Sequence, residues 1–135
     1  AGNVLHVHDL VDWVSEEAEI AGKAAADYIN GNLKKRDHKI RITPAQNVTY
    51  TVPQTIEYEF GDKKFVKVFM RVTKPMEDVK VKFLNQGEEI ISYPKKIVMP
   101  GEMVTANLPA ALVKDTMEEI EVSIVKKAGE SNGKK

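Results

Sequence analysis

The sequence predicts a mainly β protein, an antiparallel Ig-like β-sandwich preceded by one amphipathic α-helix. Three observations predict this class. Apolar residues recur at helical spacing near the start of the chain, they alternate with polar residues over most of the remainder, and turn signals divide that remainder into short segments. The length of 135 residues fits one ordinary domain, or one small domain with an extra segment.

The helix is predicted over residues 14–29, because small or apolar residues recur there on one face. They are Ala18, Ala21, Gly22, Ala25, Tyr28 and Ile29. Asp12 or Ser15 is expected to supply the N-cap oxygen, and Asn30-Gly31 the left-handed C-terminal stop. Because Ala and Gly cover little of the backbone, we expect this face to pack closely on a sheet or on a ligand.

A polar linker is predicted over residues 31–38, and a β-sandwich over residues 39–127. The strands are expected at about 39–43, 47–52, 55–60, 65–73, 78–85, 88–92, 95–99 with 103–108, and 117–126. Each strand offers one inward row of large residues, which fits two packed sheets better than a barrel around a ligand. The tail, residues 128–135, is expected to be disordered.

Composition excludes several classes of function. Twenty Lys and Arg balance twenty Asp and Glu, so no electrostatic argument arises for nucleic acid or for an anionic membrane surface. No apolar run approaches the ~20 residues of a membrane span, and we expect a soluble, cytoplasmic protein. The absence of cysteine excludes disulfides, thiolate nucleophiles and iron–sulfur ligation by this chain. Redox chemistry would therefore require an organic cofactor.

The candidate chemical groups near the start of the chain favour structural roles. His6 and His8 would share a face of a strand, but a zinc site needs further ligands, and a structural or hydrogen-bonded pair is favoured over a metal site. Ser15 lacks the sequence context of a hydrolase nucleophile and is better explained as a helix cap. Neither G-x-G-x-x-G nor G-x-x-x-x-G-K-[ST] occurs in the chain. We therefore expect no catalytic residue and no metal ligand here.

The opening stretch AGNVLHVHDLVDWVSEEAEIAGKAAADYI resembles the C-terminal end of the FAD-binding region in oxidoreductases of the pyridine nucleotide-disulfide reductase type. Residues 1–3 match a strand-end A-G-D motif, with Asn in place of Asp, and residues 18–25 match a helix of the form A-x-x-A-G-x-x-A-A. The chain is most similar to a bacterial branch of NAD(FAD)-dependent dehydrogenases. That branch combines a G-N-x-L-x-V-H-D-L-V-D stretch with a terminal β-domain, and it is often encoded beside a glycerol-3-phosphate-dehydrogenase-like flavoprotein.

This resemblance implies FAD and NAD(P) as cofactors of a full-length parent protein. Asn3, at the motif position that follows Gly2, is implied as the ligand of the flavin ribityl chain, and Asp9 offers an alternative register for the same role. The turn from Asp12 to Ser15 is implied to lie near the isoalloxazine ring. These five residues are the candidate cofactor-binding residues of the chain.

The resemblance also implies that the chain is a C-terminal fragment of a FAD-dependent oxidoreductase, with residues 1–30 as the end of its FAD-binding domain. Its partners would be the missing N-terminal FAD/NAD(P)-binding domain and a glycerol-3-phosphate-dehydrogenase-like flavoprotein. By itself the chain is expected to be catalytically incomplete and to hold no cofactor. An unpaired helix face would favour a homo-oligomer. The alternative is a non-enzymatic β-sandwich protein-interaction module, for which the first thirty residues are a helical extension.

Overall fold

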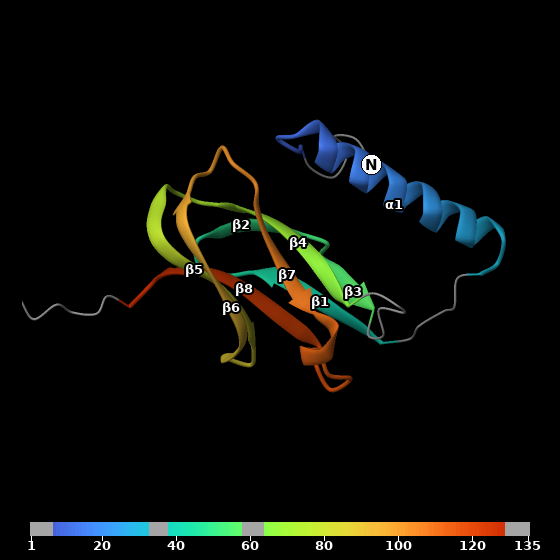
Figure 1. Ribbon diagram of the computed structural model, residues 1–135. Helices are drawn as coiled ribbons and strands as arrows, with labels where there is room; N and C mark the ends of the chain where they lie inside the picture. The colour runs from blue at the N-terminus through green and yellow to red at the C-terminus, as the bar shows by residue number, and fades with distance from the viewer. Residues whose placement is uncertain (1–6, 33–37, 58–63, 129–135) are drawn as a thin grey trace, which may run out of the picture. The chain divides into compact units, whose positions relative to one another are not determined.

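The structure, a computed structural model, describes residues 7–32, 38–57 and 64–128 (Figure 1). The chain divides into two compact units, residues 1–36 and residues 37–135. The first contains the helix α1 (Val11–Ile29), and the described part of the second contains eight strands. The prediction of a β-sandwich preceded by one helix is therefore confirmed. The expected tail falls almost wholly outside the described residues.

Two sheets form the second unit. A five-stranded sheet has the order β3-β1-β8-β5-β6, and a three-stranded sheet has the order β2-β4-β7. A short 3₁₀ turn, η1 (Ala110–Leu112), follows β7. The strands are β1 (Lys39–Pro44), β2 (Val48–Val52), β3 (Thr55–Glu57), β4 (Phe65–Val72), β5 (Met76–Asn85), β6 (Glu88–Val98), β7 (Val104–Pro109) and β8 (Glu119–Lys126).

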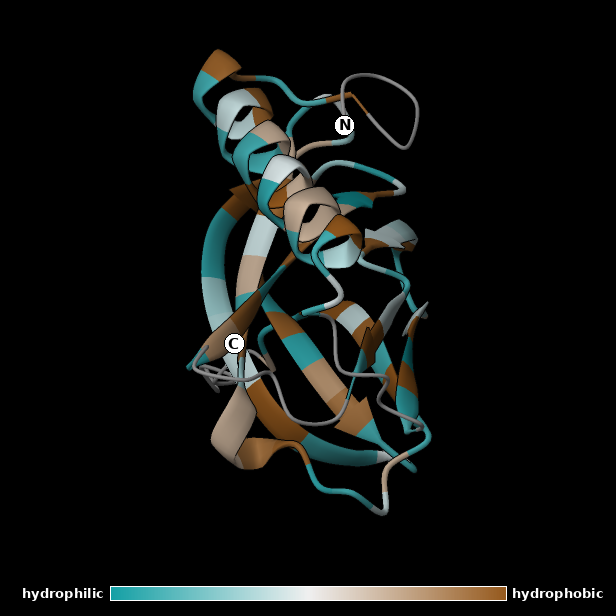
Figure 2. Cartoon of the chain, turned by 90° about the vertical axis from the view of Figure 1, so that its right-hand side faces the viewer, coloured by the Kyte–Doolittle hydropathy of each residue, from teal (hydrophilic) through white to brown (hydrophobic). Residues whose placement is uncertain are grey.

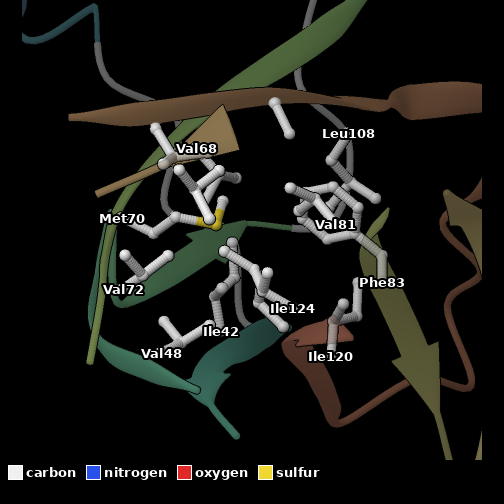
Figure 3. Close-up of a cluster of buried hydrophobic side chains, with 14 of the residues drawn as sticks. Ile42, Val48, Val68, Met70, Val72, Val81, Phe83, Leu108, Ile120 and Ile124 are labelled. Carbon is white, nitrogen blue, oxygen red and sulfur yellow. The ribbon is translucent and has the colours of Figure 1, made fainter. Parts of the chain in front are cut away.

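The core lies between the two sheets and follows the alternation of the sequence. On β5, Val79, Val81 and Phe83 are completely buried, while Lys80 and Lys82 between them are partly exposed. Strand β4 repeats this pattern, and β8 does so except that Ser123, between two buried residues, is buried as well. Figure 3 shows the apolar side chains of both sheets pointing toward one another. Because side chains alternate between the faces of a strand, one face of each sheet is enclosed and the other is solvated.

Strand β6 corrects the expected strand pattern. Tyr93-Pro94 was expected to end one strand and begin another, but β6 continues through both residues, and Pro94 is paired with Lys80. Proline is tolerated here because β6 lies at the edge of its sheet, where a missing N–H interrupts no second ladder. The segments expected to combine over 95–99 and 103–108 belong to different sheets, as the end of β6 and as β7.

The pairing of β1 with β8 is parallel, whereas the sequence predicts an antiparallel sandwich. All other strand pairs are antiparallel within the described residues. Alternation specifies which side chains of a strand are buried, but not which strand becomes its neighbour or in which direction that neighbour runs. Ile42 and Ile120 stand opposite each other in this pair and are both buried, so the parallel pairing satisfies the same alternation.

The helix α1 begins three residues earlier than predicted. Leu10 occupies the N-cap position and makes no side-chain capping hydrogen bond, so neither Asp12 nor Ser15 is the cap; both lie inside the helix. The predicted stop is confirmed, since Gly31 has a φ of 69° directly after the last turn. No residue of α1 is buried in this structure, and the expected packing of its Ala and Gly face on a sheet or a ligand stays a prediction. Figure 2 shows hydrophilic and hydrophobic residues alternating along its surface.

Candidate functional site

Residues 7–17, which lead into α1 and form its first turns, are called here the helix entry. Three of the candidate cofactor-binding residues lie in it: Asp9 in the bend before the helix, Asp12 in the first turn and Ser15 in the second. All three residues are exposed. Gly2 and Asn3, the other two, lie outside the described residues. The helix entry is therefore the part of the candidate site whose structure is described.

His8 is the buried centre of the helix entry. It is the one buried residue among residues 7–32, and its side chain is fully enclosed. Its Nε2 lies 3.3 Å from Oε2 of Glu17, whose side chain is 21% exposed. The imidazole also meets the indole of Trp13 edge to face, with ring centroids 6.2 Å apart and an interplanar angle of 66°. The chain before the helix is thus folded back onto the first two turns of α1.

The helix entry is acidic, and its backbone presents donors. Asp9, Asp12, Glu16 and Glu17 lie within nine positions, and Lys23 is the only basic residue from 7 to 32. The first helical hydrogen bond runs from the Val14 amide to the Leu10 carbonyl, over 3.4 Å. The backbone amides that precede Val14 in the helix belong to its first turn, where the helix itself offers no carbonyl to accept their hydrogen bonds. Carboxylates accept hydrogen bonds from hydroxyl groups, whereas they repel phosphates.

The carboxylates and first-turn amides of the helix entry fit part of a flavin. Carboxylate oxygens suit the hydroxyl groups of a ribityl chain, and first-turn amides suit a ring carbonyl that gains negative charge on reduction. These groups do not fit the pyrophosphate of FAD, for which basic or glycine-rich backbone groups are needed. The polar groups of the helix entry therefore suit the hydroxyl groups of a ribityl chain better than a pyrophosphate.

His8 and His38, the two described histidines, belong to different units of the chain. The described residues contain no cluster of three or more His, Asp or Glu side chains suited to a metal ion. His38 belongs to the second unit, where its Nε2 lies 2.8 Å from the carbonyl oxygen of Met117. His6 lies outside the described residues. His8 contacts a carboxylate and an indole.

Sequence reasoning missed the grouping of His8, Trp13 and Glu17, although one signal for it was present. Trp13 and Glu17 stand four residues apart in the helix and therefore lie on the same face. The expected helix began at residue 14, which left Trp13 outside it and hid this spacing. Only the fold shows that His8 turns back onto that face.

The solvated surface of the sandwich carries mixed charges. Lys82 and Glu89 form an ion pair over 2.8 Å, and Lys96 lies 3.4 Å from Asp78. Hydrogen bonds from Lys82, and secondarily from Ser92, lower the pKa of Glu89 below its ordinary value. These pairs lie on exposed or half-exposed side chains, and such pairs contribute little to stability. They give the surface no net charge that would select a charged ligand.

No protein-family model, curated protein or solved structure matches the chain. Among the described residues, no helix combines the length and the hydropathy needed to cross a bilayer. The features that bear on function are therefore the helix entry, the exposed face of α1 and the resemblance of residues 1–30 to the end of a FAD-binding region.

Proposed function

We propose that the chain is the C-terminal part of a FAD-dependent oxidoreductase, which transfers electrons between NAD(P)H and a substrate or partner flavoprotein. The proposal is supported by the likeness of residues 1–30 to the end of such a FAD-binding region. In this proposal the chain contributes the helix that closes the flavin site, together with an accessory β-sandwich. It contributes no catalytic residue.

One observation carries the proposal: α1 is a long helix with an apolar face and no buried residue. Val11, Tyr28 and Ile29 are 79%, 75% and 80% exposed, respectively. Most helical stability in proteins comes from tertiary packing of an apolar face, because helix nucleation is costly. The described residues of the first unit do not enclose this face by themselves. A face of this kind requires a partner, and the FAD-binding domain of the parent is the partner that the resemblance implies.

Gly22 adds to this argument. A glycine inside a helix costs roughly 0.5–1 kcal/mol relative to alanine, so its presence calls for a reason. Among the described residues, a Cβ atom at this position would meet nothing within 4 Å. No contact among the described residues of the first unit therefore requires glycine here. Close approach of another backbone or of a ring to this turn would require it.

In the parent protein, FAD would supply the hydride acceptor for NAD(P)H. Asp9, or Asn3 in the other register, would accept a hydrogen bond from a ribityl hydroxyl. The first-turn amides of α1 would face the isoalloxazine ring, where they favour negative charge. The adenine and pyrophosphate ends of the cofactor would be held by the missing domain, so the chain alone would not retain FAD.

The test is to read and express the coding sequence that precedes Ala1. We expect a G-x-G-x-x-G loop between a strand and a helix, and a yellow protein whose flavin absorbance survives gel filtration. The present chain, purified in the same way, should be colourless. A start codon directly before Ala1 would contradict the proposal and favour the alternative, a β-sandwich interaction module with a helical extension. A yellow preparation of the present chain would contradict the assignment of most cofactor contacts to the missing domain.

A further inference from the structure

The His8 side chain is enclosed in a unit whose other described side chains are not. Every other residue from 7 to 32 is exposed or half-exposed, including the large apolar residues of α1. An imidazole is a polar group, and enclosing one is unfavourable unless its nitrogen atoms find suitable neighbours. Oε2 of Glu17 lies 3.3 Å from Nε2 of His8, a charge contact without hydrogen-bond geometry. The enclosure of His8 is therefore a specific feature that local helix formation does not explain.

We infer that His8 is a positioning residue. Through Glu17 and Trp13 it anchors the chain before α1 on the helix, and thereby fixes Asp9 relative to the first turn. This inference rests on the proposed function, in which Asp9 accepts a hydrogen bond from a ribityl hydroxyl of FAD. It deepens that function, because it says which residues hold the acceptor in place.

The two contacts of His8 have different roles. Carboxylate oxygens only accept hydrogen bonds, so the approach of Glu17 is favourable when Nε2 of His8 carries hydrogen. Trp13 presents its ring edge to face with the imidazole, which restricts the tilt of that ring. Together they fix both the place and the orientation of His8. Asp9 is the next residue along the chain, so its backbone can move little while His8 is held.

The geometry also explains why the acceptor needs an anchor. Asp9 is exposed and lies in a bend, outside the hydrogen-bonded part of α1. A hydroxyl acceptor on a loose bend must be ordered when the ligand binds, and that ordering reduces affinity. An anchor on the adjacent residue provides this order before binding. Preorganisation of this kind raises affinity without adding a contact to the ligand.

The first experiment uses the present chain, in which Trp13 is the only tryptophan and its emission reports directly on the cluster. We expect Glu17→Ala and His8→Ala to shift Trp13 emission to longer wavelength and to speed amide exchange of residues 8–14 about tenfold or more. Glu17→Gln, which keeps an acceptor oxygen, should restore most of the order. Glu19→Ala, an exposed glutamate on the same helix, is the matched control. Because alanine favours helix, lost order in Glu17→Ala cannot be attributed to helix propensity.

The second experiment uses the longer protein with FAD bound. We expect His8→Phe, which keeps an aromatic ring beside Trp13 but has no nitrogen, to weaken FAD binding about tenfold, or ~1.4 kcal/mol, with the KM for NAD(P)H unchanged. Asp9→Ala, which removes the acceptor oxygens, should weaken FAD binding similarly. The double variant should be little worse than Asp9→Ala alone, because His8 acts through Asp9.

The outcomes separate this inference from the proposed function. Additive losses of FAD affinity in the double variant would overturn the positioning role of His8. So would Trp13 emission and amide exchange in His8→Ala that equal those of Glu19→Ala. In either case, a longer protein that is yellow would still support the proposed oxidoreductase function. A longer protein that binds no flavin would remove the proposed function, and the role of His8 toward FAD with it.

Discussion

The β-sandwich encloses a cluster of apolar side chains between its own two sheets, whereas no apolar side chain of α1 is buried. Phe83 on β5 is completely buried, and Ile29 at the end of α1 is 80% exposed. The difference lies in what each element needs for burial. Strands with one apolar face can cover one another in two sheets, but a single helix has no second layer of its own. The sandwich therefore builds its core from its own strands, whereas the described residues of the first unit do not enclose the apolar face of α1.

The largest expected effect on stability comes from truncating a buried side chain in the core of the sandwich. Phe83→Ala should lower the free energy of unfolding of the sandwich by about 3–5 kcal/mol, because it removes a fully buried ring and leaves a cavity. Ile29→Ala on α1 is the matched control and should change it by less than ~0.5 kcal/mol. Urea unfolding followed by circular dichroism measures both values. Equal losses would show that α1 takes part in the same core.

A smaller loss is expected from a buried hydroxyl group in the sandwich. Thr51 is 1% exposed, and its Oγ1 donates to the carbonyl of Ile42 over 3.0 Å. Thr51→Val keeps the shape but leaves that carbonyl without this donor, which should cost about 1–2 kcal/mol of unfolding free energy. Thr73→Val, at an exposed position, serves as the control in the same urea titration. If Thr51→Val left the free energy of unfolding unchanged, the Ile42 carbonyl would have to accept a hydrogen bond from another donor.

A still smaller effect concerns the pH dependence of the sandwich. The pKa of Glu89 is lowered in the folded state, chiefly by the hydrogen bond from Lys82. A carboxyl group with a lowered pKa contributes stability above its unfolded pKa, and loses that contribution as the pH falls through the folded pKa. The wild-type chain should therefore exceed Glu89→Gln slightly in stability near neutral pH, and this difference should vanish at acid pH.

Thermal unfolding of the two chains at several pH values measures the Glu89 effect. Because the Glu89 side chain is 40% exposed, added salt should reduce it further. A difference between the chains that grew toward acid pH would contradict the assigned direction of the pKa shift.

The smallest effect is expected from removing α1 itself. Deleting residues 1–36 should leave the free energy of unfolding of the sandwich unchanged within ~0.5 kcal/mol, because every residue of the buried cluster belongs to residues 37–135. A cooperative thermal transition with an unchanged β signal in circular dichroism would agree with this. Loss of that signal on truncation would show that the sandwich needs the helix to fold.

Much of the sandwich could be predicted because period-two alternation is a local pattern. Val79, Val81 and Phe83 occupy alternate positions of the strand expected at 78–85, and the fold buries all three. Gln86 and Gly87 fall between the strands expected at 78–85 and 88–92, and both have positive φ, at 49° and 83°. Pro94 led to a wrong prediction of a strand end. A proline interrupts a strand that is paired on both sides, but β6 is an edge strand, and edge position depends on the whole sheet.

The candidate site was predicted less completely. Asp9, Asp12 and Ser15 were identified by resemblance, and the structure places them together at the helix entry without testing their proposed contacts to a flavin. The grouping of His8 with Glu17 spans nine positions and crosses a helix boundary, so no single periodicity connects the two residues. The cofactor assignment stays a prediction.

The sequence by itself determined the class of the fold, the rows of side chains that enter the core and the position at which the helix ends. These depend on interactions within a few residues, such as alternation along a strand and the positive φ that Gly31 allows. The tertiary structure alone decided that β1 runs parallel to β8, that β6 continues through Pro94, and that His8 is enclosed while the apolar face of α1 is not. Each of these depends on which distant segment becomes a neighbour, and neither composition nor periodicity encodes that choice.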